Sequence, residues 1–343
     1  MDKYIGLDLH PRSFLLHARN NDGSDLLSQS GETSARRLVE LVSSLKGRLH
    51  LAVEESSLAD WAFRLLSPYA EVMVTDPRRN RWIAGDENMD DGKAAERLAE
   101  MLRSGLLCPV HHSESAERQA FKELVQAYHD TSKQLARFKN KLKGKFARLA
   151  IACRGTSVYK PEDREQWIAK FPEGKVPVQV LLLWDTVDHL QEHKDCLQRE
   201  MAQAGKQFPQ IARFQKVPGV GPIRAATFFA FIDTPHRFPT RGKLWTYCGI
   251  GIARSQSGQG RPVEHLTYFG NRILKDMAKG AALSATQAGK DNPFARKYRR
   301  LLQDGKDPQI ALLDVARSIV TTLWAMWRKD QEYHPTTTPD GKA

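Results

Sequence analysis

The chain has 343 residues, of which 41% are hydrophobic and 27% charged, with four cysteines. This length exceeds the usual size of a single-core domain and predicts two or three units. No apolar run approaches the roughly 18 residues that a membrane-spanning helix needs, and the start MDKYIGLDLH lacks a secretory signal, so we expect a cytoplasmic protein without a membrane partner. The cysteines lie about 40 to 50 residues apart without CxxC pairing, which favours neither a disulfide framework nor a zinc site.

The net charge of +12 is unevenly distributed along the chain. Residues 1–112 contain 14 Lys+Arg and 17 Asp+Glu, whereas residues 113–343 contain 38 and 23 and have a net charge of +15. The excess of positive charge in residues 113–343 favours a polyanionic partner, and nucleic acid is the partner we expect first. A basic protein without such a partner is the alternative.

Residues 1–112 are predicted to alternate strands and helices. Three β-prone segments come first, and helical spacing then alternates with further strands. This order predicts a mixed α/β sheet with helices on its faces. The predicted elements are strands at 3–10, 13–20 and 26–31, a helix at 34–45, a strand at 49–55, a helix at 58–66, a strand at 70–77 and a helix at 91–105.

Three carboxylates occupy the ends of these elements. Asp8 lies near the end of the first strand, Glu54 near the end of a later strand, and Asp91 at the head of the last helix. Since strand ends and helix starts of an α/β sheet converge on one edge, the three can meet there. Gathered carboxylates repel one another unless a divalent cation neutralises them, and oxygen-only ligation favours Mg²⁺ or Mn²⁺. The pattern indicates a metal site for phosphoryl chemistry; the alternative is three unrelated structural acids.

Residues 113–206 contain two segments with apolar residues at alternating spacings of three and four. The first runs from Phe121 through Leu135 and Leu142 to Leu149, and the second from Val180 to Met201. Such spacing predicts a coiled coil, within or between chains, or an ordinary helical core. The first segment also carries a basic run that is either a phosphate-binding face or a solvated surface. This run consists of Arg137, Lys139, Lys141, Lys143, Lys145 and Arg148.

Two glycine-containing turns follow. Gly219-Val220-Gly221 precedes an apolar segment, and the N–H groups of such a hairpin at a helix start can hold a DNA phosphate; a plain turn between helices is the alternative. Further on, the loop ARSQSGQGRP, residues 253–262, holds Ser255 and Ser257 directly after a hydrophobic run. This loop is either a surface turn or a nucleophile held beside an anion.

Several residues between positions 219 and 272 occur in an order that is specific enough for comparison with a known family. They are Gly219, Gly221 and Pro222, then Tyr247 and Gly249, then Ser257 and Gly258, then Gly270, Asn271 and Arg272. This order closely resembles the C-terminal transposase domain of the DEDD-type insertion-sequence transposases. The front third resembles the RuvC-like domain of the same family, in which IGLDLH supplies Asp8 and LAVEES supplies Glu54.

The resemblance covers nearly the whole chain and implies its organisation. It implies an α/β RuvC-like (RNase H-like) domain at 1–112 and a mainly helical transposase domain with a serine loop at 207–333. Between them lies a helical coiled-coil region at 113–206, with a long connection at 153–177 that is rich in proline, glycine and charge. Residues 334–343 are expected to form a flexible tail.

The chain departs from the family at one acidic position. The last acidic motif of the family is Asp-x-x-Asp-Ala at a helix start, and here the matching stretch is Asp91-Gly92-Lys93-Ala94-Ala95. Ala94 therefore occupies the place of the fourth acid, and Asp90 can replace it only with a shift of helix register. Either this chain works with three carboxylates or it is an inactivated variant, and we prefer the second interpretation.

The resemblance implies an RNA-guided DNA recombinase. A noncoding bridge RNA would pair with donor and target DNA, and dimers of the protein, assembled into a tetramer, would exchange the strands. Ser257 would form a phosphoserine link with DNA in a composite site with the Mg²⁺-binding acids, with Ser255 as the second choice. The protein would be bacterial, cytoplasmic and nucleoid-associated. The contacts implied for nucleic acid outside the basic run are Gly219, Gly221, Arg254, Arg261, Asn271 and Arg272.

Two other functions fit the same residues. A metal-only junction-resolving nuclease would use water as its nucleophile, and Ser257 would then be an ordinary loop residue. A non-enzymatic RNA- or DNA-binding scaffold would carry vestigial acids, which agrees with the alanine at position 94. A covalent protein–DNA adduct is expected for the recombinase alone.

Overall fold

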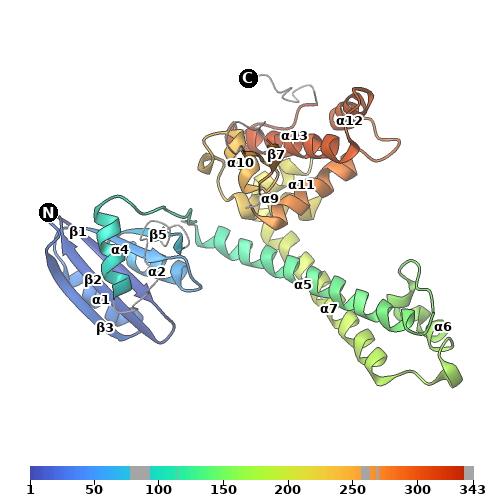
Figure 1. Cartoon of the computed structure of the whole chain (residues 1–343), viewed down its shortest axis with the longest axis horizontal. Coiled ribbons are helices and arrows are strands. Elements are labelled where there is room, and N and C mark those ends of the chain that lie inside the picture. Colours follow the sequence, from blue (N-terminus) through green and yellow to red (C-terminus); the bar gives the residue numbers. More distant parts are fainter. Residues whose placement is uncertain (78–92, 114, 256–262, 268–269, 336–343) are drawn as a thin grey trace. The chain divides into compact units, whose positions relative to one another are not determined.

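The computed structural model of the chain describes residues 1–77, 93–113, 115–255, 263–267 and 270–335. The chain forms two units, Met1–Glu114 and Ser115–Ala343. Figure 1 shows the helices and strands of each unit.

The first unit contains a five-stranded sheet in the order β3-β2-β1-β4-β5. The first three strands pair antiparallel, whereas β1, β4 and β5 run parallel. The predicted mixed α/β sheet is therefore confirmed. The elements are β1 (Asp2–Leu9), β2 (Ser13–Asn20), β3 (Asp25–Glu32), α1 (Ala35–Ser44), β4 (Arg48–Glu54), α2 (Ala59–Leu66), β5 (Glu71–Thr75) and α4 (Ala94–Arg103).

The two faces of the sheet differ in the size of their side chains. Ile5 and Leu7 of β1 and Leu51 of β4 are fully buried on one face, in a core that includes residues of α1 and α2. On the other face β1 presents Gly6, where an added Cβ would lie 2.0 Å from the carbonyl oxygen of Ala95. The backbone of α4 therefore lies directly on β1, and a larger residue at position 6 has no room.

The direction of α4 places its first residue at the carboxyl edge of the parallel strands. Its early residue Ala95 lies over Gly6, and its last residue, Arg103, donates to the carbonyl oxygen of Asn21 at 3.3 Å. Asn21 follows β2 at the opposite edge, since Asn20 pairs with Lys3 near the start of β1. The helix thus begins where β1 and β4 end.

The second unit begins with two long helices, α5 (Ala116–Ala147) and α7 (Val178–Ala204), which pack side by side (Figure 1). Phe121, Tyr128, Leu135 and Leu142 are buried at every seventh position of α5, as the apolar spacing predicted. Leu149 does not continue the series, because α5 ends at Ala147 and Leu149 is 45% exposed.

The connection between α5 and α7 folds onto the far end of the helical pair. Its short helices are η2 (Ser157–Tyr159), η3 (Pro161–Asp163), α6 (Arg164–Ile168) and η4 (Pro172–Gly174). Trp167 and Phe171 of this segment form a core with Phe146 of α5 and Trp184 of α7. The indole N–H of Trp184 donates to the carbonyl oxygen of Val158 at 2.7 Å, so the connection is attached to α7.

The rest of the second unit is mainly helical, as predicted. Its core contains Phe228, Phe229 and Trp327 and also takes in Phe121 and Tyr128 from the first half of α5. The elements are η5 (Gly205–Gln207), α8 (Pro209–Phe214), α9 (Pro222–Ile232), η6 (Pro235–Arg237), α10 (Arg241–Tyr247), the hairpin of β6 (Ile252–Ser255) and β7 (Val263–Leu266), α11 (Arg272–Ala285), α12 (Pro293–Gln303) and α13 (Pro308–Arg328).

The last helix, α13, corrects one expectation from the sequence. It is long and apolar enough to cross a membrane by length and composition. However, 61% of its most apolar window is buried inside the unit. A central core helix passes the same test, so its hydropathy is weak support for a membrane span.

Candidate functional site

Asp8 and Glu54 occupy neighbouring positions of two parallel strands. The register of β1 and β4 pairs Gly6 with Ala52 and Leu7 with Val53, so the next positions are Asp8 and Glu54. Adjacent strands lie about 4.8 Å apart, and residues two apart on a strand share a face. Both acids therefore lie on the face that α4 covers, beside the start of that helix. The structure brings these two predicted site residues together.

The start of α4 lies at the same edge. Lys93 precedes the helix and makes no side-chain cap hydrogen bond, and Ala94 is its first residue. An aspartate at position 94 would stand in the first turn, where the helix dipole favours negative charge. Asp91, the third predicted acid, lies outside the described residues. Within the described ranges, no three His, Cys, Asp or Glu side chains gather as metal ligands.

His10 is a neighbour of this edge that the sequence reasoning missed. Its Nε2 lies 3.4 Å from Oδ1 of Asp8, and the Asp8 side chain is 24% exposed, so water reaches the carboxylate. The signal was present in the stretch DLH, because a residue two positions after Asp8 in an extended segment shares its face.

A cluster of ion pairs attaches α4 to the sheet. Arg19 of β2, whose side chain is 15% exposed, lies 2.7 Å from Glu96 and 3.1 Å from Glu100 on α4, and 2.8 Å from Asp25 of β3. Arg103 hydrogen-bonds Glu100 and, with Ser104 and Arg19, lowers the pKa of that carboxyl to about 2. These contacts fix the helix whose first residue is Ala94.

The serine loop lies between β6 and β7, and Ser257 and Arg261 are outside the described residues. Arg254 and Ser255 are the last two residues of β6, whose backbone pairs with Glu264 and Val263 of β7. The structure thus defines the hairpin that leads to the serine loop.

Gly249 and Gly270, the motif glycines before and after this hairpin in the sequence, contact each other. Gly249 has φ +67°, Gly270 has φ +159°, and a Cβ on Gly270 would lie 2.5 Å from the Cα of Gly249. The next residue, Asn271, donates its N–H to the carbonyl of Tyr247 at 2.7 Å and caps α11 by accepting from the N–H of Leu274. Arg272, the first residue of α11, is exposed.

The two glycines before α9 have different surroundings. Gly219 has φ +85°, and an added Cβ would lie 2.2 Å from the carbonyl oxygen of Ala281 on α11. Its own carbonyl accepts from Arg224 at 2.8 Å. Gly221 is the N-cap of α9, and a Cβ there would have nothing within 4 Å. Gly219 therefore serves packing, whereas Gly221 leaves the helix start open to a ligand.

The cations of the basic run, which ends at Arg148 just after α5, differ in their contacts. Lys139 donates to Gln191 at 3.1 Å, burial lowers the pKa of its amino group, and Lys143 donates to the carbonyl of Gly155 at 2.9 Å. The amino groups of Lys139 and Lys143 lie over the ring of Tyr159, so both cations stabilise the connection. Arg137, the first cation of the run, is exposed.

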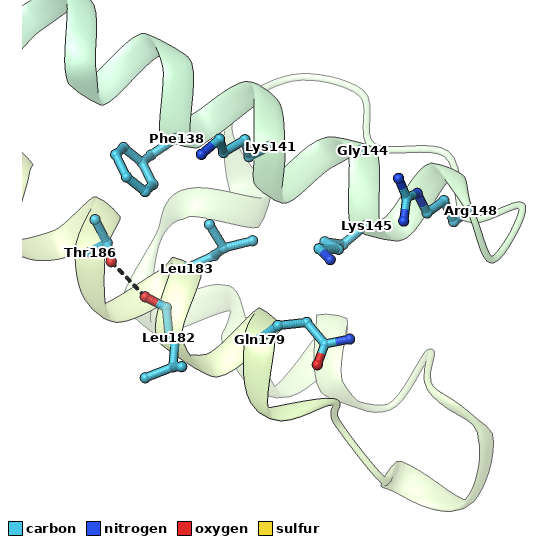
Figure 2. A pocket seen from close by; sticks show the side chains of 9 residues that line it. All are labelled: Phe138, Lys141, Gly144, Lys145, Arg148, Gln179, Leu182, Leu183 and Thr186. Carbon is cyan, nitrogen blue, oxygen red and sulfur yellow. Dashed lines mark hydrogen bonds between the residues drawn. The ribbon is translucent and has the colours of Figure 1, made fainter.

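The remaining cations, Lys141, Lys145 and Arg148, line a groove of about 590 Å³ between α5 and α7. Figure 2 shows Lys145 of α5 and Gln179 of α7 on the two sides of this groove, with Leu182 and Leu183 along its α7 side. The groove combines positive charge with apolar surface. Leu182 lies outside the predicted apolar seam and is 60% exposed.

Comparison with known proteins finds a family match within the second unit. Residues 211–299, from α8 into α12, match the family described as Transposase IS116/IS110/IS902 family. Residues 211–299 are therefore similar to an insertion-sequence transposase family. This match includes the contacting glycines, the hairpin and the capped start of α11.

Two curated relatives come from insertion elements. The chain is 28% identical over 178 residues to an IS110 uncharacterized 43.6 kDa protein of Streptomyces coelicolor, covering 52% of this chain and 43% of the relative. It is 26% identical over 137 residues to an IS116 uncharacterized 44.8 kDa protein of Streptomyces clavuligerus, covering 40% of this chain and 34% of the relative. The matched parts thus span less than half the length of each relative.

Proposed function

We propose that the chain is the RNA-guided recombinase of an insertion element and exchanges DNA strands through a covalent link to Ser257. The observation that carries this proposal is the match of residues 211–299 to a transposase family. Its first unit would be the RuvC-like metal-binding domain, because Asp8 and Glu54 end neighbouring strands at the head of α4.

The donor set at this edge fits Mg²⁺ or Mn²⁺. Asp8 and Glu54 offer only oxygen ligands, which hard divalent cations prefer, and Asp91 would add a third carboxylate. A bound cation would supply Lewis acidity and lower the pKa of a hydroxyl group. The two carboxylates would hold the cation, and either could accept a proton from the attacking hydroxyl.

The chemistry assigned to Ser257 conserves the phosphodiester energy. The hydroxyl would transfer its proton to a base, its oxygen would bond to phosphorus, and the P–O bond to one DNA strand would break, leaving a free hydroxyl end. Attack by that end or by another strand end would reverse the step. Arg254 and Arg261 flank the loop in sequence and would offset the growing negative charge on the phosphate.

A bridge RNA and the donor and target DNA are the proposed polyanionic partners. Residues 113–343 carry a net charge of +15, and Lys141, Lys145 and Arg148 line an open groove. Contacts of this kind bind backbones irrespective of sequence and leave sequence recognition to base pairing. The exposed Leu181 and Leu182 of α7 favour self-association of the helical pair into dimers and tetramers.

Ala94 favours a second candidate, a catalytically silent RNA- or DNA-binding chain. The described head of α4 has no acid at positions 93 to 95. In this case, the chain would bind the same nucleic acids without cutting them. The two candidates differ in whether restoring one carboxylate restores chemistry.

A covalent adduct with DNA tests the proposal. In the Ala94→Asp background with Mg²⁺ and copurified RNA, we expect labelled DNA to remain attached to the denatured protein. Ser257→Ala should abolish the adduct and leave DNA binding unchanged, whereas Ser255→Ala should retain it. An adduct lost only in Ser255→Ala would reassign the nucleophile. Cleavage without any adduct would favour the water-using nuclease, and neither cleavage nor adduct would favour the scaffold.

A further inference from the structure

The foot of the β6–β7 hairpin, by which we mean Ile250 and Gly251 directly before β6, is attached to α13. This helix lies beyond the matched family segment, which ends at residue 299. Figure 1 shows α13 beside α10, the helix that precedes the hairpin. Three polar side chains of α13, at positions 317, 321 and 324, share one side of the helix because their spacing is four and three.

Each of these side chains makes a hydrogen bond to the segment that leads into the hairpin. Arg317 donates from Nε to the carbonyl oxygen of Ile250 at 2.8 Å, and Thr321 accepts from the indole N–H of Trp245 at 2.9 Å. Trp324 donates to the carbonyl oxygen of Pro235 at 2.7 Å. The side of α13 therefore follows the chain from η6 through α10 to the start of β6.

Arg317 makes the contact nearest the serine loop. Ile250 is fully buried and lies two residues before β6, and the carbonyl of the intervening Gly251 accepts from the N–H of Thr267 after β7. An added Cβ on Gly251 would lie 2.8 Å from the hydroxyl oxygen of Thr246, so this foot is closely packed. Fixing the Ile250 carbonyl thus fixes the point from which both strands leave the core.

Burying the charge of Arg317 costs free energy, and an ion pair with a nearby carboxylate offsets part of this cost. Its side chain is 8% exposed, and its Nη1 lies 2.6 Å from Oδ1 of Asp314, which also pairs with Lys306. A buried ion pair contributes little net stability compared with apolar packing, so stability is a weak reason for an arginine here. What the guanidinium adds is a directed hydrogen bond to one main-chain oxygen.

We infer that Arg317 is a positioning residue for the serine loop, acting through the Ile250 carbonyl at the foot of the β6–β7 hairpin. This inference rests on the proposed function, because it assigns the hairpin the task of presenting the serine hydroxyl to DNA. Arg317 itself touches no substrate. Its removal should slow the chemical step at saturating DNA without weakening DNA binding.

Two substitutions at position 317 and one matched control test this inference. Arg317→Met removes both contacts, whereas Arg317→Lys retains a cation for Asp314 and loses the Nε donor to Ile250. Lys306→Met is the control because Lys306 shares the partner Asp314 and has no contact with Ile250. If Arg317→Met fails to fold, Arg317→Lys decides the outcome.

The first measurement is backbone hydrogen exchange, which needs no activity. We expect amides in 250–255 and 263–267 to exchange about tenfold faster or more in both Arg317 variants, with α9 and α11 unchanged, because the local opening free energy falls. Lys306→Met should exchange like the parent. Unchanged exchange at the hairpin in Arg317→Lys, or an equal increase across the whole unit, would overturn the inference.

The second measurement is the rate of adduct formation in the Ala94→Asp background. At saturating DNA, the rate should fall about tenfold or more in both Arg317 variants, and the half-saturating DNA concentration should change less than about twofold. A rate equal to that of Lys306→Met would overturn the positioning role even if exchange increases. If the parent with Arg317 intact forms no adduct, the proposed function fails, and the inference about the serine loop fails with it.

Discussion

Asp8 and Glu54 lie side by side at the carboxyl ends of two parallel strands, one position beyond the pair of Leu7 and Val53. Two carboxylates at neighbouring strand ends on the same face of a sheet repel each other, and a divalent cation between them removes the repulsion. We therefore expect Mn²⁺ to raise the melting temperature of the chain, and Asp8→Asn or Glu54→Gln to abolish most of this increase. Calorimetry with and without Mn²⁺ measures the effect.

Asp2→Asn is the control for the metal prediction. Asp2 starts the same strand at the opposite edge, beside His50, so its removal should leave the Mn²⁺ response intact. An equal response to Mn²⁺ in the parent and in Asp8→Asn would contradict a metal site at this edge.

Ala94→Asp should restore strand cleavage. The new carboxylate would stand in the first turn of α4 and stabilise the helix by about 0.3–1 kcal/mol through the dipole. Lys93→Asp is the matched control, because it places an acid at the same helix start one position out of register. Both variants should melt slightly higher, but only Ala94→Asp should cut DNA; equal cleavage rates in the two would mean that position 94 is not a ligand position.

Alanine substitutions at the two glycines before α9 should distinguish a role in packing from a role in DNA binding. Gly219→Ala places a Cβ 2.2 Å from the Ala281 carbonyl oxygen and should cost about 2 kcal/mol or more of unfolding free energy. Gly221→Ala meets nothing within 4 Å and should cost only about 1 kcal/mol or less, because alanine is a poorer N-cap than glycine. If Gly221 holds a phosphate, its alanine variant should bind DNA less tightly. Unchanged DNA affinity would identify Gly221 as a plain turn residue.

Two exposed leucines of α7 should control self-association. Leu135 and Leu142 are buried within the helical pair, so charging them would unfold it rather than test oligomerisation. Leu181 and Leu182 are 47% and 60% exposed, and replacing both with glutamate should lower the mass measured by light scattering. Leu283→Glu, at a leucine of α11 that is 59% exposed, is the control. An unchanged mass would mean that the helical pair is purely internal.

The attachment of α4 should weaken in acid. The hydrogen bond from Arg103 lowers the pKa of Glu100 from 4.5 to about 2, so the native state binds fewer protons than the unfolded state in this range. The stabilisation is complete above pH 4.5 and is lost as the pH falls towards 2. Glu100→Gln should flatten the fall of stability over this window in urea unfolding. Glu96→Gln, which removes the other α4 partner of Arg19, should fall more steeply than Glu100→Gln.

The sequence predicted which side of each helix is apolar. It did not predict which residues of other elements pack against that side. The seven-residue spacing of α5 identified Phe121 and Leu142, but Phe121 packs into the core around α9 and Leu142 into the core with Trp167. Spacing along one helix carries no information about which neighbour covers each turn. The sheet was predictable from the order of strand and helix segments, and the approach of Asp8 and Glu54 followed because parallel strands bring their ends to one edge.

Contacts between distant residues left little local signal. Gly249 and Gly270 stood out in the sequence as motif positions, but their mutual approach depends on tertiary packing. A lone arginine in an apolar segment, such as Arg317, resembles any helix residue until its burial and its bond to Ile250 are known. Residues that position a site through the backbone are therefore the ones that pattern reasoning misses.

One continuous helix joins the two cores of the second unit. The 32 residues of α5 span about 48 Å at 1.5 Å per residue; Phe121 and Val125 lie in one core and Leu142 and Phe146 in the other. A molecule held at the far end can bend or tilt this helix only by moving Phe121 and Val125 against α9 and its neighbours. Mechanical load on the tip therefore reaches the core around α9 through one continuous helix.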